Sequence, residues 1–379
     1  MMQGGQKTKR LEFIDSLRGW AVFGVIMVHA NALVFDKLPI QLQVISSSGA
    51  RGVQLFFILS AFSLFYSLDR RKQRGEPEGV VKFTLRRFFR IAPMFYVAIV
   101  IYGMGILHIL YPWLYEKTQY SIANIFAHFT FIHGFWPNYV NSLVPGGWSI
   151  ATEMAFYAIV PLLFHKIRTV SHAIWFFIIS MALYAGMSLV SGGPTYFSTS
   201  VWADFIFFFL PSQLIAFSLG ILLFMFFRRE HFHDDVKYAS LKPYADHLMV
   251  LGFVGVIVMF LNRQYTSILF SLPLFFIAWS LSLKSRKILV NRYMSFFGKI
   301  SFSVYLLHFL LIPFVSKFVL SALPPPLTGI GASILYFEIV ALTTIFVVPL
   351  AYATYRFIER PGMALGERVI RTISRKPQV

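Results

Sequence analysis

The chain lacks cysteine and has few charged residues. Because none of its 379 residues is a cysteine, disulfides, thiolate metal sites and a cysteine nucleophile are excluded. Charged residues make up 13% of the chain, against about 25% in a typical soluble domain. Hydrophobic residues make up 57%, including 43 phenylalanines, whose rings are compatible with lipid but would cause aggregation in water. The composition therefore predicts an integral membrane protein.

Acidic residues are also scarce. The 16 Asp and Glu stand against 34 Lys and Arg, which leaves a formal net charge of +18. In a soluble protein this excess would suggest nucleic acid, but membrane proteins collect Lys and Arg in their cytoplasmic loops. We therefore expect no nucleic-acid partner. The first apolar run contains a histidine and many further runs follow it, so we also expect no cleavable signal peptide.

Ten apolar runs approach the roughly 20 residues that a helix needs to cross a bilayer. They lie near residues 17–35, 52–68, 91–111, 148–164, 173–191, 202–227, 247–261, 267–283, 302–320 and 331–355. The sequence therefore predicts an all-α polytopic membrane protein of about ten transmembrane helices, in a single membrane domain of residues 1–379. The run 122–136 is shorter and contains Asn124, His128 and His133, so we interpret it as a re-entrant or interfacial helix.

The basic residues give this arrangement an orientation. With a cytoplasmic N-terminus, the segments on the cytoplasmic side contain all but five of the 34 Lys and Arg. The five exceptions are Lys37, Arg51, Lys117, Arg263 and Lys317. If 122–136 were a span, every later basic loop would lie outside, against the positive-inside rule. We therefore expect both termini in the cytoplasm.

The first and fourth predicted spans contain ionisable residues that lipid makes costly, so each of these is a candidate functional residue. Arg18 and His29 are eleven residues apart, which places them on one helix face with a rise of about 16 Å. The alternative is a snorkelling arginine and a histidine bonded to a neighbouring helix. Glu153 lies a turn or two into the fourth span from its outer end and needs a donor or a water-filled cavity. A structural pairing with a helix terminus is its alternative role.

Two further features add polar groups. The loop Arg86-Arg87-Phe88-Phe89-Arg90 precedes a helix that we expect to begin at Ile91. Arg87 and Arg90 are three residues apart, so on a helical turn they would share a face and could bind one phosphate group together. The alternative is that these residues are basic only because the cytoplasmic loops of membrane proteins are generally rich in Lys and Arg. His308 lies in the ninth span, where a lone histidine is more often a packing residue.

These residues occur in motifs that resemble those of the acyltransferase-3 family, which consists of bacterial membrane O-acyltransferases. Arg18, ten residues and then His29 are similar to its N-terminal signature. The other similar motifs are Gly52–Ser60, Arg87-Phe88-Phe89-Arg90 with Pro93, Trp148-Ser149 through Glu153 to Tyr157, Gly298–His308 and Glu359-Arg360-Pro361. They follow the family's order from residue 12 to 361. One departure is Ala61, where the family usually has glycine.

The resemblance implies a multi-pass enzyme of the bacterial cytoplasmic (inner) membrane. It implies no permanently bound cofactor and no metal. Acyl-CoA, most often acetyl-CoA, would be the donor substrate, and a surface glycan or its lipid-linked precursor would be the acceptor. The chain lacks the extracytoplasmic esterase-like domain that some relatives carry, so we expect the membrane domain to complete the transfer. Nothing in the sequence sets the oligomeric state.

We assign provisional roles on this basis. Arg18, Arg87 and Arg90 would hold the CoA phosphates. His29 would be a general base or a transient acyl carrier, and Glu153 would bind the acceptor or orient a base. We expect a tunnel between the CoA site and the acceptor site, and the residues expected to line it are Ser149, Tyr305 and His308.

Two other functions stay open. A proton-coupled secondary transporter would also use buried His and Glu residues, although no inverted repeat is visible. An acyltransferase that acts on a cytoplasmic small molecule would differ only in where the acceptor binds.

Overall fold

The regular elements of the computed structural model are all helices within the residues that it describes, which are 11–31, 34–76, 78–103, 120–190, 198–232, 240–262, 268–321 and 328–375. The α-helices are α1 (Glu12–Asn31), α2 (Ile40–Ser48), α3 (Gly52–Gln73), α4 (Val80–Gly103), α7 (Ile122–Phe129), α8 (Gly147–Lys166), α9 (Val170–Leu189), α10 (Thr199–Phe208), α11 (Leu210–Phe232), α12 (Ala245–Leu261), α13 (Ser271–Leu283), α14 (Arg292–Lys299), α15 (Ser301–Ser321), α16 (Ile330–Thr354) and α17 (Arg360–Arg375). The short turns are η1 (Phe35–Lys37), η2 (Gly49–Arg51), η3 (Ile132–Phe135), η4 (Lys242–Tyr244), η5 (Ile268–Phe270) and the π-helical η6 (Tyr355–Glu359).

This architecture confirms the predicted all-α polytopic membrane protein. Eight helical segments of the described chain are long and apolar enough to cross a membrane. Of the other two predicted spans, 267–283 corresponds to the shorter apolar segment Ile268–Leu283. The span 91–111 corresponds to α4 as far as Gly103, and its remainder lies outside the described residues. The segment 122–136 forms only α7 and η3, which are too short to span, as predicted.

Two predicted boundaries are wrong, and both helices are longer than expected. Arg86–Arg90 do not form a loop, because α4 begins at Val80 and includes Pro93. The last helical segment does not end near residue 355, because α16 continues through η6 into α17 as far as Arg375. Hydropathy falls in both places, but α4 and α17 pack against each other and thereby keep the polar segments helical.

Glycines set the closest helix contacts. A Cβ on Gly52 would lie 2.2 Å from the carbonyl oxygen of Ala21, so α3 begins in backbone contact with α1. A Cβ on Gly220 of α11 would lie 2.1 Å from the carbonyl oxygen of Ile58 in α3. Small residues let membrane helices approach in this way, since lipid supplies no hydrophobic force between them. Helix α3 is therefore held between α1 and α11.

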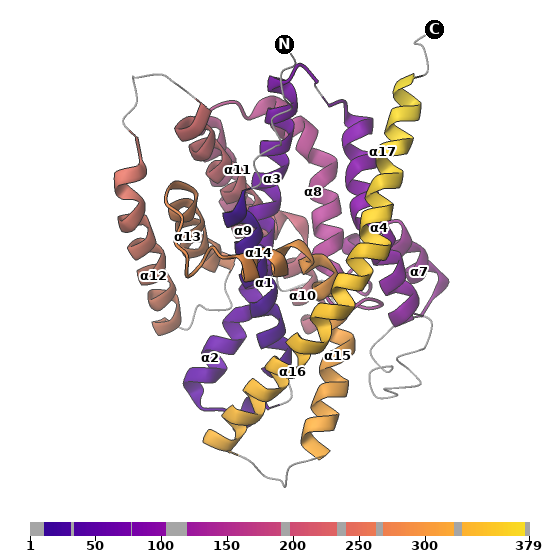
Figure 1. Cartoon of the computed structure of the whole chain (residues 1–379), viewed down its shortest axis with the longest axis vertical. Coiled ribbons are helices and arrows are strands. Elements are labelled where there is room, and N and C mark those ends of the chain that lie inside the picture. Colours follow the sequence, from indigo (N-terminus) through magenta and orange to yellow (C-terminus); the bar gives the residue numbers. More distant parts are fainter. Residues whose placement is uncertain are drawn as a thin grey trace.

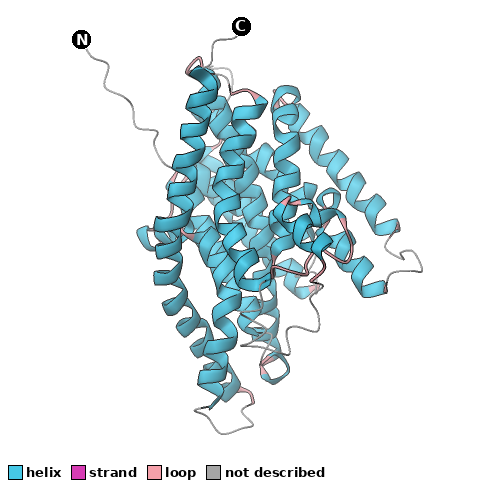
Figure 2. Ribbon diagram, turned by 90° about the vertical axis from the view of Figure 1, so that its right-hand side faces the viewer, coloured by secondary structure: helices cyan, strands magenta, loops and turns pink. Residues whose placement is uncertain are grey.

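The helices lie roughly along one long axis (Figure 2). The end of α3 and the end of α17 lie at one end of the molecule, whereas the end of α15 and the start of α16 lie at the other (Figure 1). Helix α14 lies across the bundle near mid-height (Figure 1) and packs against α1. The chain therefore has two distinct ends, with the long helices between them.

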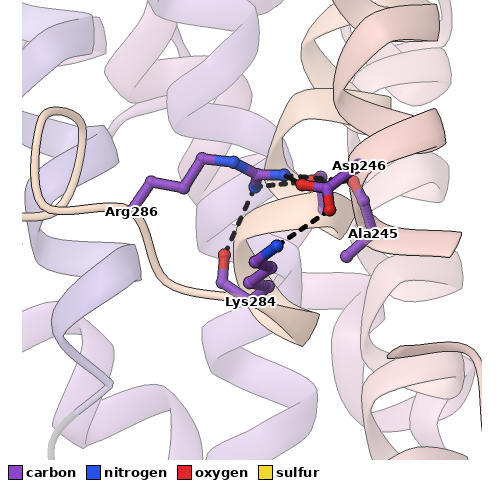
Figure 3. A network of polar contacts seen from close by, with 5 residues as sticks. Ala245, Asp246, Lys284 and Arg286 are labelled. Carbon is purple, nitrogen blue, oxygen red and sulfur yellow. Dashed lines mark hydrogen bonds and ion pairs between the residues drawn. The ribbon is translucent and has the colours of Figure 1, made fainter. Parts of the chain in front are cut away.

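Segments that the charge pattern predicts on one side of the membrane meet in the structure. Asp246, in the first turn of α12, accepts hydrogen bonds from Lys284 Nζ at 2.8 Å and Arg286 Nη2 at 2.5 Å (Figure 3). Arg286 also donates to the hydroxyl of Ser280 in α13 at 2.9 Å. These contacts tie the start of α12 to the end of α13.

Candidate functional site

One pocket collects most of the predicted site residues. It lies between α1, α3, α4, α8 and α15, and its lining includes Arg18, Arg87, Arg90, Glu153 and Tyr305. Its empty volume is about 740 Å³ with the solvent at its mouth included, which is within the usual range for ligand pockets. Residues that are up to about 290 positions apart in the chain thus form one site.

The three arginines of the pocket form no ion pair within the described part of the chain, although the charges of Asp15 and Glu153 act favourably on Arg18. Arg18 Nη2 donates to the hydroxyl of Ser63 at 3.1 Å, and Arg87 Nε is buried without a hydrogen-bond partner. The charge of Arg90 acts repulsively on both Arg18 and Arg87. Three like charges with few carboxylates nearby and no close ion pair are unfavourable, so the cluster is suited to a ligand with more than one negative charge.

Glu153 is the carboxylate of the pocket, and two hydroxyls hold it. Ser60 Oγ and Tyr157 OH each donate to Glu153 Oε1 at 2.5 Å. The predicted need for a donor partner is thus met, and both donors are buried. Glu153 also interacts electrostatically with Arg18 and Arg87. The sequence places Glu153 near the outer end of its helix, away from the arginines, whereas the structure puts all of them around one cavity.

A second hydroxyl pair lies where α8 begins. Ser149 Oγ donates to the hydroxyl of Tyr305 at 2.9 Å, and Tyr305 OH donates to the carbonyl oxygen of Gly146 at 2.9 Å. Gly146 has a φ of +74°, and a Cβ there would lie 2.7 Å from the hydroxyl of Tyr305. The glycine therefore allows both the backbone turn and the close approach of Tyr305. Ser149 and Tyr305 line the pocket, in accordance with the sequence prediction.

The two predicted histidines lie beside the pocket and are not among its lining residues. The rings of His29 and His308 have centroids 5.2 Å apart, and both pack against Phe309 at 4.3 and 4.1 Å. The ring of His308 lies 5.9 Å from that of Tyr305. His308 Nε2 is buried and has no hydrogen-bond partner among the described residues, while its Nδ1 lies 3.2 Å from the carbonyl oxygen of Val304. Tyr305 therefore stands between the arginine pocket and the pair of imidazoles.

A second histidine pair supports the start of α8. His128 and His133 stack with centroids 3.9 Å apart at an interplanar angle of 8°. His133 Nε2 lies 3.1 Å from the carbonyl oxygen of Gly147, directly before the Trp148-Ser149 motif. Burial lowers the pKa of His128 to about 3 and that of His133 to about 4. Both rings are thus neutral at pH 7, and they pack the turn that places Ser149.

The last family-like motif anchors α15. Ser303 Oγ donates to Glu359 Oε1, and the hydroxyl of Thr354 donates to Ser303 Oγ at 2.9 Å. Glu359 is buried and interacts electrostatically with Arg90. The motif at Glu359 therefore holds the first turn of α15 at Ser303, which is two residues before Tyr305.

The pocket is also lined by three hydroxyl residues for which the sequence predicted no role: Ser60, Ser63 and Tyr157. Tyr157 follows Glu153 by four residues, so both lie on one face of α8. Ser60 and Ser63 are three apart on α3 and face the same pocket. That spacing, next to an intramembrane carboxylate, is the signal that could have identified them.

Known proteins are similar to this chain over almost its full length. A family model described as an acyltransferase domain matches residues 11–356. A Staphylococcus aureus (strain COL) protein named "Putative O-acetyltransferase SACOL0978" is 28% identical over 97% of the chain and 60% of its own length. The O-acetyltransferase OatA of S. aureus (strain NCTC 8325 / PS 47) is 24% identical over 96% of the chain and 59% of its own length. No solved structure gives a significant match.

The chain thus spans about 60% of the length of these curated relatives. The matched part includes the whole pocket and both histidine pairs, since these residues lie within 11–356.

Proposed function

Since the chain belongs to the acyltransferase-3 family, we propose that it is a membrane O-acyltransferase that transfers an acyl group, most often acetyl, from acyl-CoA. The acceptor is a hydroxyl of a surface glycan or of its lipid-linked precursor. The observation that carries this proposal is the pocket in which three arginines that form no ion pair in the described chain adjoin a carboxylate held by two hydroxyls. The names of the relatives, both O-acetyltransferases, support the same reaction class.

The proposed orientation puts both termini in the cytoplasm of a bacterium, with the protein in its inner membrane. The end of the molecule where α3 and α17 end has the basic residues Arg70, Arg71 and Lys72 in the last turn of α3. The positive-inside rule assigns such an end to the cytoplasm. Arg87 and Arg90 lie on α4, which begins soon after this turn.

The donor in this proposal is acyl-CoA, which enters from the cytoplasm. Its phosphates provide several negative charges on one ligand, and Arg18, Arg87 and Arg90 provide the complementary charges. The thioester would then extend along α1 towards His29, which is about 16 Å from Arg18 along the helix axis. Tyr305 lies on this route, between the pocket and His308.

The transfer step needs a base and two bond changes. A neutral His29 imidazole takes the proton of the acceptor hydroxyl while the oxygen attacks the thioester carbonyl. The new ester C–O bond forms, the C–S bond breaks, and the CoA thiolate leaves and takes a proton from the imidazolium. If His29 carries the acyl group instead, its imidazole first attacks the thioester, the C–S bond breaks, and the CoA thiolate leaves with the imidazole N–H proton. The acceptor hydroxyl then attacks the acyl-imidazole, the C–N bond breaks, and the hydroxyl proton returns to the imidazole. The adjacent His308 ring would share the proton in either route.

Glu153 has the second role in this reaction. Its Oε1 already accepts two hydrogen bonds, so we propose that its other oxygen accepts a hydrogen bond from another part of the acceptor. Its negative charge also keeps the pocket from being purely cationic, which helps the CoA product to leave.

The central test is acetyl transfer by the His29→Ala variant in membrane vesicles that contain acetyl-CoA and a glycan extract. We expect transfer to fall by about 10²-fold to 10⁴-fold, the usual contribution of a general base, while CoA affinity is retained. The exposed His172→Ala variant is the matched control and should transfer normally. Persisting transfer by His29→Ala would refute the role of His29.

Binding of CoA distinguishes the enzyme from the alternative of a proton-coupled carrier, which has no reason to recognise CoA. The acceptor is found by mass spectrometry of surface glycans from cells with and without the gene. A difference of one acetyl mass identifies both reaction and acceptor, whereas acylation of a soluble metabolite would favour the cytoplasmic alternative.

A further inference from the structure

Arg51 is a buried arginine that has no role in the pocket. It ends the turn η2, immediately before α3, and is only 7% exposed. Its Nε and Nη1 atoms are buried without a hydrogen-bond partner, and it forms no ion pair with any carboxylate in the described chain. Its guanidinium carbon lies 5.3 Å from the ring centroid of Phe207, and the phenol of Tyr184 interacts with its charge.

A buried charge in this state is costly. Burial removes a guanidinium from water, and the usual compensation is a carboxylate together with hydrogen bonds to each N–H group. The face of Phe207 supplies part of that compensation through a cation–π contact, but it accepts no hydrogen bond at Nε or Nη1. The local backbone cannot simply turn the side chain out, because Gly49 and Gly52 on either side are in backbone contact with α1.

Arg51 directly precedes α3 and lies far along this helix from the arginines of the pocket, although the pocket lining itself extends along α3 to Val53. Ser63, which accepts from Arg18, is twelve residues further along α3, so the two levels are about 18 Å apart along the helix axis. Arg51 is also one of the five basic residues that the charge pattern places outside. An anion at Arg51 is therefore a separate ligand group from one at Arg18, Arg87 and Arg90.

Aromatic contacts connect Arg51 to the far end of the pocket. Phe207 packs against Trp148 with ring centroids 6.4 Å apart. Trp148 precedes Ser149, which lines the pocket and bonds to Tyr305. A group bound by Arg51 would thus lie one aromatic layer from the Ser149–Tyr305 end, where an acceptor that enters from outside would approach.

We propose that Arg51 binds an oxyanion, a phosphate or a carboxylate, on the acceptor substrate. The inference rests on the proposed function, because it takes the side opposite the CoA arginines as the acceptor side. A guanidinium matches both oxyanions in geometry and charge. The acceptor is then an acidic glycan or a phosphate-linked glycan, and a neutral sugar lacks the group that Arg51 recognises.

The test uses the full chain in nanodiscs of phosphatidylcholine, with CoA at saturation so that the arginine pocket is occupied. The probes are glucuronate, glucose 1-phosphate and glucose, and the readouts are the dissociation constant and the shift in melting temperature. We expect the wild type to bind one or both anionic probes more tightly than glucose. Arg51→Gln should raise the dissociation constant for that anionic probe by about 10-fold to 100-fold, so that it binds no more tightly than glucose. Whichever anionic probe binds more tightly identifies the oxyanion.

Two variants and one further measurement keep the outcome clear. Arg51→Lys should retain part of the binding, and the exposed Arg168→Gln should retain all of it. Without probe, Arg51→Gln should melt no lower than the wild type, because an unpaired buried charge has been removed. A lower melting temperature together with unchanged probe binding would show a structural role and overturn the proposal, as would equal binding of all three probes by the wild type. Failure of the wild type to bind CoA would instead refute the proposed function.

Discussion

Arg86 and Arg87 are neighbours on α4, yet they lie in different environments. Arg86 Nε donates to Glu78 Oε1 at 2.7 Å, and Arg86 also pairs with Glu367 of α17. Arg87 lines the pocket, has no carboxylate partner in the described chain and lies with its guanidinium 5.7 Å from the ring centroid of Phe83. Successive residues of a helix point about 100° apart, so one step in sequence separates a neutralised arginine from an available one.

The difference shows how positive charge is divided in this protein. Basic residues outside the pocket often have carboxylates, as in Asp246 with Lys284 and Arg286, or Asp69 with Arg228. Those charges fix loops and helix ends. Arg18, Arg87 and Arg90 form no ion pair in the described chain and line a cavity, where an incoming anion would provide the missing charge. Partner carboxylates, rather than basic residues alone, therefore separate structural arginines from ligand-binding candidates.

The largest expected effect comes from reversing the available charges. Arg87→Glu combined with Arg90→Glu should weaken CoA binding by about 10²-fold to 10⁴-fold, because each charge-assisted hydrogen bond contributes about 1.5–3 kcal/mol. The measurement is titration of CoA into purified, membrane-inserted protein. Unchanged CoA affinity would show that the pocket arginines bind no ligand and do not differ from the arginines that pair with carboxylates.

A smaller effect is expected at the carboxylate within the pocket. Glu153→Gln keeps the shape of the side chain and an oxygen that accepts from Ser60 and Tyr157, but removes the charge. We expect acyl transfer to fall by about 10²-fold, whereas CoA affinity should hold or rise because Arg18 and Arg87 lose a competing anion. Weaker CoA binding in this variant would place Glu153 on the donor side instead.

The hydroxyls that hold Glu153 should contribute less. Tyr157→Phe and Ser60→Ala each remove one hydrogen bond, worth about 1 kcal/mol, so transfer should fall by about 5-fold in each variant. Rates would be measured over a range of acetyl-CoA concentrations and compared with those of Ser63→Ala. That variant removes the partner of Arg18 and should instead raise the KM for acetyl-CoA. The same KM change in all three variants would argue against a separate role for the carboxylate.

The smallest effect on the site is expected at Arg86. Arg86→Gln should leave CoA affinity unchanged and reduce the free energy of unfolding by about 1 kcal/mol, since Arg86 and Glu367 are partly exposed and the buried Glu78 keeps its pair with Arg71. Thermal unfolding in detergent micelles measures the loss, and Glu367→Gln should give a similar one. If Arg86→Gln weakens CoA binding as much as Arg87→Gln, position in the pocket is not what distinguishes the two.

Much of the fold follows from one-dimensional patterns. Apolar length identifies the membrane helices, and the polar residues Asn124, His128 and His133 correctly exclude 122–136 as a span. The helical spacing of Arg87 and Arg90 correctly puts both on one side of α4, and both line the pocket. The start of α4 and the extension into α17 could not be predicted in this way, because these polar segments are helical only through packing against each other.

The sequence by itself determined that this is an all-α membrane protein, how its helices are ordered and which intramembrane residues are costly to bury. The helical period and the cost of burying a polar side chain depend on residues close together in the chain, so both can be recognised in a single sequence. Only the tertiary structure decided that Glu153 shares a cavity with Arg18 and Arg87, that Tyr305 separates this cavity from His29 and His308, and that Arg51 forms no ion pair with a described residue. Those facts depend on which helix faces meet, and glycines such as Gly52 and Gly220 set these contacts through backbone distances that no local pattern specifies.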